Sequence, residues 1–125
     1  MKSQPVYLNL LKIKLPIMGV VSLLHRMTGV ALIVVIPLSL YIFQSSLQGE
    51  QGFKEAVGLL NSPLLMWIEI LIFSALMYHL FAGFRFLLMD AEFGLSKSKA
   101  IFSSWLVIAA TAFSSVLFII MRVLS

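Results

Sequence analysis

The sequence contains no cysteine, so the chain itself cannot form a disulfide, a thiolate zinc site or a cysteine-ligated iron–sulfur cluster. It is also poor in charge, because only 11% of its residues are charged, against about 25% in an average soluble domain. Histidine occurs only twice. The low charge, together with the excess of apolar residues in so short a chain, excludes an ordinary soluble enzyme, a nucleic-acid-binding module and a disordered tail. A redox metal on this chain would have to be held by histidine, methionine or carboxylate.

Apolar residues are in large excess. They make up 61% of the 125 residues, and the mean hydropathy is +1.05. A chain of this size has too little interior to hide so much apolar surface from water, so the surrounding solvent is membrane lipid. A membrane-spanning helix needs about 20 apolar residues. The sequence therefore predicts an all-α membrane protein with three transmembrane helices.

Polar connections divide the chain into segments. The predicted boundaries are a cytoplasmic or interfacial N-terminal segment at 1–21, transmembrane helices at 22–47, 64–89 and 101–124, a periplasmic connection at 48–63 and a cytoplasmic connection at 90–100. The N-terminal segment is expected to be a retained amphipathic stretch on the membrane surface. It lacks the features of a cleaved signal, because His25 and Arg26 interrupt the apolar run and no A-x-A-like site follows.

Lysine and arginine are distributed unevenly over the predicted connections. The N-terminal side holds Lys2, Lys12, Lys14 and Arg26, and the second connection and its flank hold Arg85, Lys97 and Lys99. The first connection holds only Lys54, and the C-terminus holds only Arg122. The positive-inside bias therefore predicts a cytoplasmic N-terminus and second connection, and a periplasmic C-terminus.

A first polar motif, S-x-x-H-R-x-T-G, opens the first apolar segment with Ser22, His25, Arg26, Thr28 and Gly29. At about 100° per residue, Ser22, Arg26 and Gly29 fall within about 40° of one another, and His25 lies about 60° from Ser22 on the other side. One stripe thus presents a hydroxyl, an imidazole and a guanidinium. Ionisable groups inside a membrane are costly and indicate function. The alternative is that His25 and Arg26 only reach toward the lipid headgroups.

A second motif, H-x-x-x-G-x-R, closes the second apolar segment with His79, Gly83 and Arg85, followed by Asp90. His79 lies about 15 Å of helix before Asp90, which places it inside the hydrocarbon. Ala75 and Gly83 share its face, so space is expected beside the imidazole for something flat. A lone histidine hydrogen-bonded to a neighbouring helix is the alternative.

The predicted topology brings five polar side chains to the cytoplasmic side at comparable depth: Ser22, His25, Arg26, His79 and Arg85. A neutral imidazole with guanidinium groups above it suits a haem, since the imidazole ligates iron and the bases pair with propionates. One histidine supplies one axial ligand, so a partner chain and a heteromeric helical bundle are implied. Glu69 and Arg122 are expected to be interfacial or helix-packing residues.

Both motifs and the three spans resemble the larger membrane-anchor subunit of succinate dehydrogenase, the cytochrome b subunit of respiratory complex II, over nearly the whole chain. The resemblance implies a bacterial inner-membrane subunit that, with a second anchor, holds the iron–sulfur and flavoprotein subunits on the cytoplasmic face. The chain would carry no flavin, and the complex would pass electrons from succinate oxidation to ubiquinone in the tricarboxylic acid cycle and aerobic respiratory chain.

The resemblance also implies residue roles. His79 would be an axial ligand of haem b, shared with a second membrane anchor subunit that supplies the other axial histidine. Ser22 and Arg26 would help form the ubiquinone site, and His25 and Arg26 would lie near the haem propionates. Phe86 departs from the family pattern, because a histidine is frequent at that position. Gln4 departs as well, because Arg-Pro is frequent where this chain has Gln-Pro.

Two other functions remain open at this stage. One is the anchor of a related quinol:fumarate reductase, because the same residues could serve either direction of electron flow. The other is a haem-free structural membrane subunit or small channel, in which His79 would only be hydrogen-bonded between helices.

Overall fold

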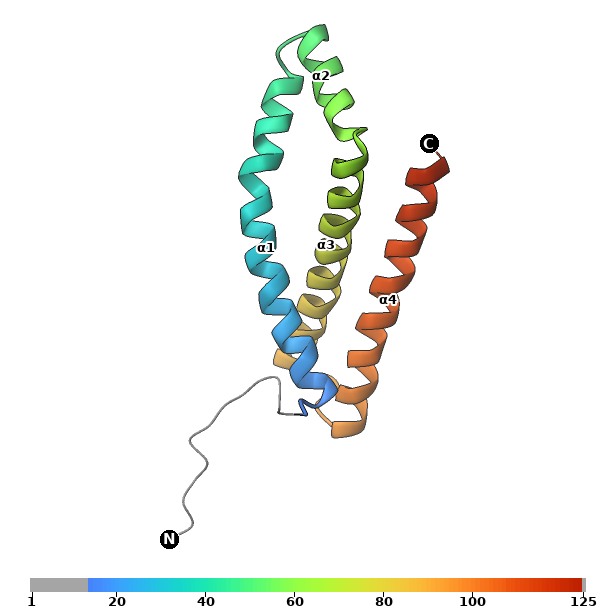
Figure 1. Ribbon diagram of the computed structural model, residues 1–125. Helices are drawn as coiled ribbons and strands as arrows, with labels where there is room; N and C mark the ends of the chain where they lie inside the picture. The colour runs from blue at the N-terminus through green and yellow to red at the C-terminus, as the bar shows by residue number, and fades with distance from the viewer. Residues whose placement is uncertain (1–13, 125) are drawn as a thin grey trace.

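Residues 14–124 are described by a computed structural model, in which they form four helices. Three are long: α1 (Ile17–Ser46), α3 (Pro63–Asp90) and α4 (Lys97–Leu124). The short α2 (Glu50–Leu60) lies in the connection between α1 and α3, at the same end of the bundle as the C-terminal end of α4 (Figure 1). Each long helix is long and apolar enough to cross a membrane. The predicted all-α fold with three spans is confirmed.

The long helices begin earlier than the sequence analysis placed them. α1 starts at Ile17, directly after Pro16, and not at 22. α4 starts at Lys97 and not at 101. The predicted surface segment 1–21 lies mostly outside the described residues, and from Ile17 onward it is the beginning of α1. In addition, α1 continues through Pro37, as membrane helices can when neighbouring groups compensate for the lost backbone bond.

Local signals define both ends of α3. At its start, Ser62 Oγ accepts a hydrogen bond from a backbone N–H of the first turn, and Pro63 occupies the first helical position, where no N–H is needed. At its end, the N–H groups of Glu92 and Phe93 donate to carbonyls of the last turn at 3.0 and 2.9 Å, the pattern of a Schellman motif. Glu92 adopts the left-handed conformation, with φ 64°, that glycine usually supplies there.

α3 lies between α1 and α4 and contacts both (Figure 1). The buried cluster is small and consists of Val21, Tyr78, Ala82 and Val107. Tyr78 Oη donates to the Val21 carbonyl at 3.1 Å, so the phenol is satisfied without water. Most other large apolar side chains of the long helices are exposed, as expected of helices whose outer faces meet lipid or partner helices.

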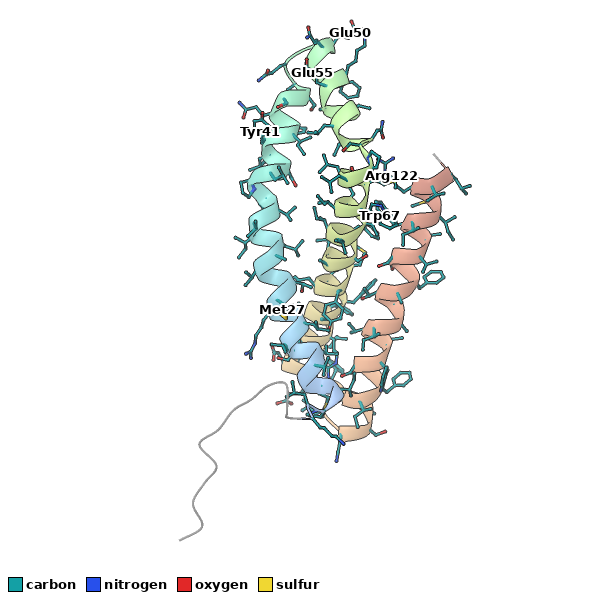
Figure 2. The ribbon with its side chains drawn as sticks, viewed as in Figure 1. Met27, Tyr41, Glu50, Glu55, Trp67 and Arg122 are labelled. Atoms are coloured by element: carbon teal, nitrogen blue, oxygen red, sulfur yellow. The ribbon has the colours of Figure 1, made fainter. Side chains whose placement is uncertain are left out.

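Arg122 connects the helices at the end of the bundle where α2 lies. Figure 2 shows it near the C-terminal end of α4, on the side facing α3. Its Nε donates to Glu69 Oε2 at 3.0 Å, and its Nη2 donates to the Leu60 carbonyl at 3.0 Å and to Asn61 Oδ1 at 3.1 Å. This one guanidinium therefore joins the end of α4 to α3 and to the connection before it. The helix-packing role expected of Glu69 and Arg122 is what the structure shows.

The connection after α1 folds back as a helix. Glu50 and Lys54 form an exposed ion pair on α2, and Ala56 is buried on its other side. A side chain on Gly52 would overlap the backbone carbonyl of Ser45, so glycine allows α2 to lie close against the end of α1. Figure 2 shows Glu50 and Glu55 at this end, away from the two polar motifs.

Candidate functional site

The imidazoles of the two motifs stack on each other in the α1–α3 interface. His25 from α1 and His79 from α3 have ring centroids 4.1 Å apart and an interplanar angle of 12°. Both side chains are half-buried. His25 therefore lies between helices, and the alternative in which it reaches toward the lipid headgroups does not describe it.

Two glycines make this stack possible. A Cβ built on Gly29 would lie 3.0 Å from His79 Cε1, and a Cβ built on Gly83 would lie 3.3 Å from His25 Nε2. Each glycine therefore faces the histidine of the opposite helix. The space that the sequence analysis expected beside His79 is taken, on the Gly83 side, by the flat ring of His25. The packing is reciprocal and ties the two motifs together.

His79 is also hydrogen-bonded to α1. Its Nδ1 lies 3.1 Å from the His25 carbonyl oxygen and 3.2 Å from Thr28 Oγ1. The Thr28 hydroxyl lies 2.9 Å from the Leu24 carbonyl and 3.0 Å from the His25 carbonyl. Within residues 14–124, Nε2 of His79 makes no hydrogen bond. One nitrogen of this imidazole is thus used for positioning, and the other is uncommitted.

Ser22 and Arg26 lie beside this pair on α1. Ser22 is half-buried and Arg26 is exposed, as is its neighbour Met27, which Figure 2 shows on α1. Neither the Ser22 hydroxyl nor the Arg26 guanidinium hydrogen-bonds another residue in the described part of the chain. As far as residues 14–124 are concerned, both polar groups are therefore available to another molecule.

Arg85 differs from the prediction. It is only 5% exposed, and its Nε donates to Ser103 Oγ at 2.9 Å while its Nη2 donates to the Ala100 carbonyl at 3.1 Å. Both acceptors belong to α4. Two nitrogens of the Arg85 guanidinium are thus bonded to α4 and are not turned toward the imidazoles. A buried guanidinium must have its donors satisfied, and α4 supplies the acceptors.

Phe86 completes the aromatic group. Its ring meets the His25 ring edge-on, with centroids 5.3 Å apart and an interplanar angle of 63°. The Arg85 guanidinium carbon lies 5.2 Å from the same Phe86 ring centre, a weak cation–π contact. An apolar ring thus closes one side of the imidazole pair.

The sequence analysis named Thr28 in the first motif without giving it a role, and it gave no role to Ser103 among the hydroxyl residues of the third apolar segment. A threonine one turn from a histidine on a membrane helix was the available signal for Thr28, since its hydroxyl must find a partner in lipid. The partner itself depends on the register of α1 against α3. For Ser103, no sequence signal distinguished it from the other hydroxyls of α4.

Comparison with known proteins decides the family. A family model described as succinate dehydrogenase/fumarate reductase transmembrane subunit matches residues 1–118. The chain belongs to this family. Among its relatives is the succinate dehydrogenase cytochrome b556 subunit of Coxiella burnetii, 32% identical over 92% of this chain and 93% of its own length. The subunit of the same name from Paracoccus denitrificans is 31% identical over 94% of this chain and 91% of its own length.

The resemblance stated from the two motifs is therefore confirmed. This succinate dehydrogenase/fumarate reductase subunit is a multi-pass membrane anchor of the cytochrome b type.

We predict that Gly29→Ala destabilises the α1–α3 interface. The added methyl would press on His79 Cε1, and overpacking of this kind typically costs about 1–3 kcal/mol. The measurement is the thermal unfolding midpoint of the purified complex. Gly58→Ala is the matched control, because Gly58 lies in helix α2 and a Cβ built there would have no atom of residues 14–124 within 4 Å beyond its own stretch of helix. Equal midpoints for the two variants would contradict the packing argument.

Proposed function

We propose that this subunit binds haem b together with a second membrane anchor and helps form the quinone site of a succinate:quinone oxidoreductase. The observation that carries the proposal is the imidazole of His79, which is held by α1 through Nδ1 and keeps Nε2 uncommitted. Histidine is a usual axial ligand of haem iron.

The donor set suits a haem better than an isolated metal ion. Among the described residues, no group of three or more His, Asp or Glu side chains could hold an ion by itself. A haem needs only one axial ligand from each side, because the porphyrin supplies the other four. His79 is the ligand from this chain, and a histidine of the second anchor is the ligand from the other side. When bound, the haem supplies a one-electron carrier inside the membrane.

The remaining residues of the first motif bind and orient. The exposed Arg26 guanidinium can form charge-assisted hydrogen bonds with a haem propionate at the membrane surface. His25 supports His79 by stacking and is the second candidate for a propionate contact. Arg85 is left out of this set, because both acceptors of its guanidinium lie on α4.

Ser22 and Arg26 are the proposed quinone-binding residues. Reduction of a quinone places negative charge on its oxygens before protons arrive, so a useful site offers a hydrogen-bond donor and a fixed cation there. Ser22 supplies the hydroxyl and Arg26 the charge, from one stripe of α1. The isoprenoid tail of ubiquinone can enter directly from lipid, because the outer face of α1 is apolar and exposed.

The proposed orientation places the N-terminus and the α3–α4 turn in the cytoplasm of a bacterial inner membrane. The iron–sulfur and flavoprotein subunits would then dock beside the two motifs. Lys97 and Lys99 in the first turn of α4, against Arg122 alone at the other end of that helix, support this orientation. The family description covers succinate dehydrogenase and fumarate reductase alike. Both relatives named here are succinate dehydrogenase subunits, which favours succinate oxidation as the physiological direction.

A reporter fused after Ser125 tests the orientation. We expect it to be active only as an exported protein, because the Lys/Arg asymmetry places the C-terminus in the periplasm. A fusion in the α3–α4 turn serves as the control and should report the cytoplasm. Cytoplasmic activity of the C-terminal fusion would contradict the proposed orientation.

We predict that His79→Leu removes the b-type haem spectrum from the assembled complex, because leucine offers no nitrogen to the iron. The optical spectrum is measured at equal flavin content, so that loss of haem is separated from loss of the whole complex. An unchanged haem spectrum would show that the iron ligand lies elsewhere.

Quinone reduction should fall in Ser22→Ala and in Arg26→Leu, by an amount on the order of 100-fold for loss of one donor. Succinate oxidation by a dye that takes electrons from the soluble subunits should persist. Ser39→Ala is the control for Ser22, since Ser39 is an exposed serine further along α1. Arg26→Lys, which keeps the charge, should retain more activity than Arg26→Leu. Normal quinone reduction in both test variants would leave this stripe as a headgroup anchor only.

A further inference from the structure

The Nδ1 atom of His79 lies beside two oxygen atoms of α1, the His25 carbonyl at 3.1 Å and the Thr28 hydroxyl at 3.2 Å. The iron-binding ability of an imidazole depends on what its other nitrogen does, because a hydrogen bond there selects the tautomer and adjusts the basicity of the ring. These two oxygens are therefore more than packing contacts.

The carbonyl determines which nitrogen carries the proton. A carbonyl oxygen can only accept a hydrogen bond, so a contact of 3.1 Å requires Nδ1 to be the donor. In the other tautomer, the Nδ1 lone pair would face the carbonyl oxygen of His25. The Thr28 hydroxyl can direct its own hydrogen to the Leu24 or His25 carbonyl, at 2.9 and 3.0 Å, and accept from Nδ1–H with a lone pair. Both oxygens thus act as acceptors.

Gly29 gives the ring access to these oxygens. A Cβ at this position would lie 3.6 Å from Nδ1 and 3.0 Å from Cε1 of His79, between the ring and the backbone of α1. The stacked His25 ring limits rotation of the imidazole from one face. The stack therefore fixes the orientation of the His79 ring, and the two acceptors keep its proton on Nδ1.

We propose that Thr28 and the backbone carbonyl of His25 are positioning groups that hold the proton of His79 on Nδ1 and leave the lone pair of Nε2 to bind iron. The inference rests on the proposed haem-binding function and assigns to that function the residues that prepare its ligand. A hydrogen bond from Nδ1–H makes the imidazole a stronger electron donor and favours ferric iron.

The test compares Thr28→Val, Thr28→Ser and Thr111→Val in the intact complex. Valine keeps the shape of threonine and removes the hydroxyl, whereas serine keeps the hydroxyl. Thr111 is the matched control, because its hydroxyl donates to the Val107 carbonyl at 2.9 Å within α4, in the same back-bonded arrangement but without a histidine. The readouts are the haem midpoint potential, haem content per flavin after dilution, and the low-spin ferric signal in electron paramagnetic resonance.

In Thr28→Val, we expect a more positive midpoint potential and about 10-fold weaker haem retention, the lower end of the effect of losing a hydrogen bond behind a metal ligand. Thr28→Ser should restore both properties, and Thr111→Val should match the unmodified complex. A Thr28→Val complex with unchanged potential and retention would overturn the positioning role while haem binding by His79 stands. Haem that persists in His79→Leu would overturn the haem proposal itself, and this inference with it.

Discussion

The contact on which the rest of this subunit depends is the reciprocal packing of His25 and His79 against the glycines of the opposite helix. Membrane helices gain little from burying apolar surface against one another, because lipid is as apolar as they are. Close approach and polar contacts must therefore set their register. In the α1–α3 pair, a stacked imidazole pair, two glycines and the bonds to His79 Nδ1 supply both. The same contacts that hold the helices together hold the proposed iron ligand.

The two cationic residues of the motifs have separate tasks for a physical reason. Arg26 is exposed and has no partner among residues 14–124, whereas Arg85 is buried and donates to α4. A buried guanidinium contributes to stability only when its N–H donors are satisfied. A guanidinium that binds a ligand from outside the chain must instead keep its N–H donors free of partners within the chain. Arg85 and Arg122 thus join α4 to α3 near its two ends. Arg26 keeps its donors available for a ligand.

Composition and hydropathy were enough to predict three spanning helices. The length of an apolar segment needed to cross the bilayer can be read along the sequence without knowing any tertiary contact. Periodicity along α1 predicted one stripe that presents Ser22, His25 and Arg26; in the structure His25 stacks on His79 of α3 and Arg26 is exposed. It could not predict the partner of Arg85, since the direction of a side chain between two helices depends on their relative rotation. α1 begins at Ile17, before the predicted span at 22–47, and Val21 in this first part of the helix is buried in a cluster with Tyr78, a residue distant in sequence.

The stacked imidazoles of His25 and His79 also restrict how the lengths of α1 and α3 can vary. Gly29 and His79 lie at matching heights, separated from the α2 connection by about 25 Å of helix on each side. One residue inserted into either stretch would rotate everything beyond it by about 100° and turn a glycine or a histidine away from its counterpart. The segment from Leu47 to Ser62 has fewer fixed contacts with the long helices: the close approach of Gly52 to α1, and the acceptors that Leu60 and Asn61 offer to Arg122. Insertions and deletions between related anchors should therefore accumulate there, while the two helix arms keep a common length.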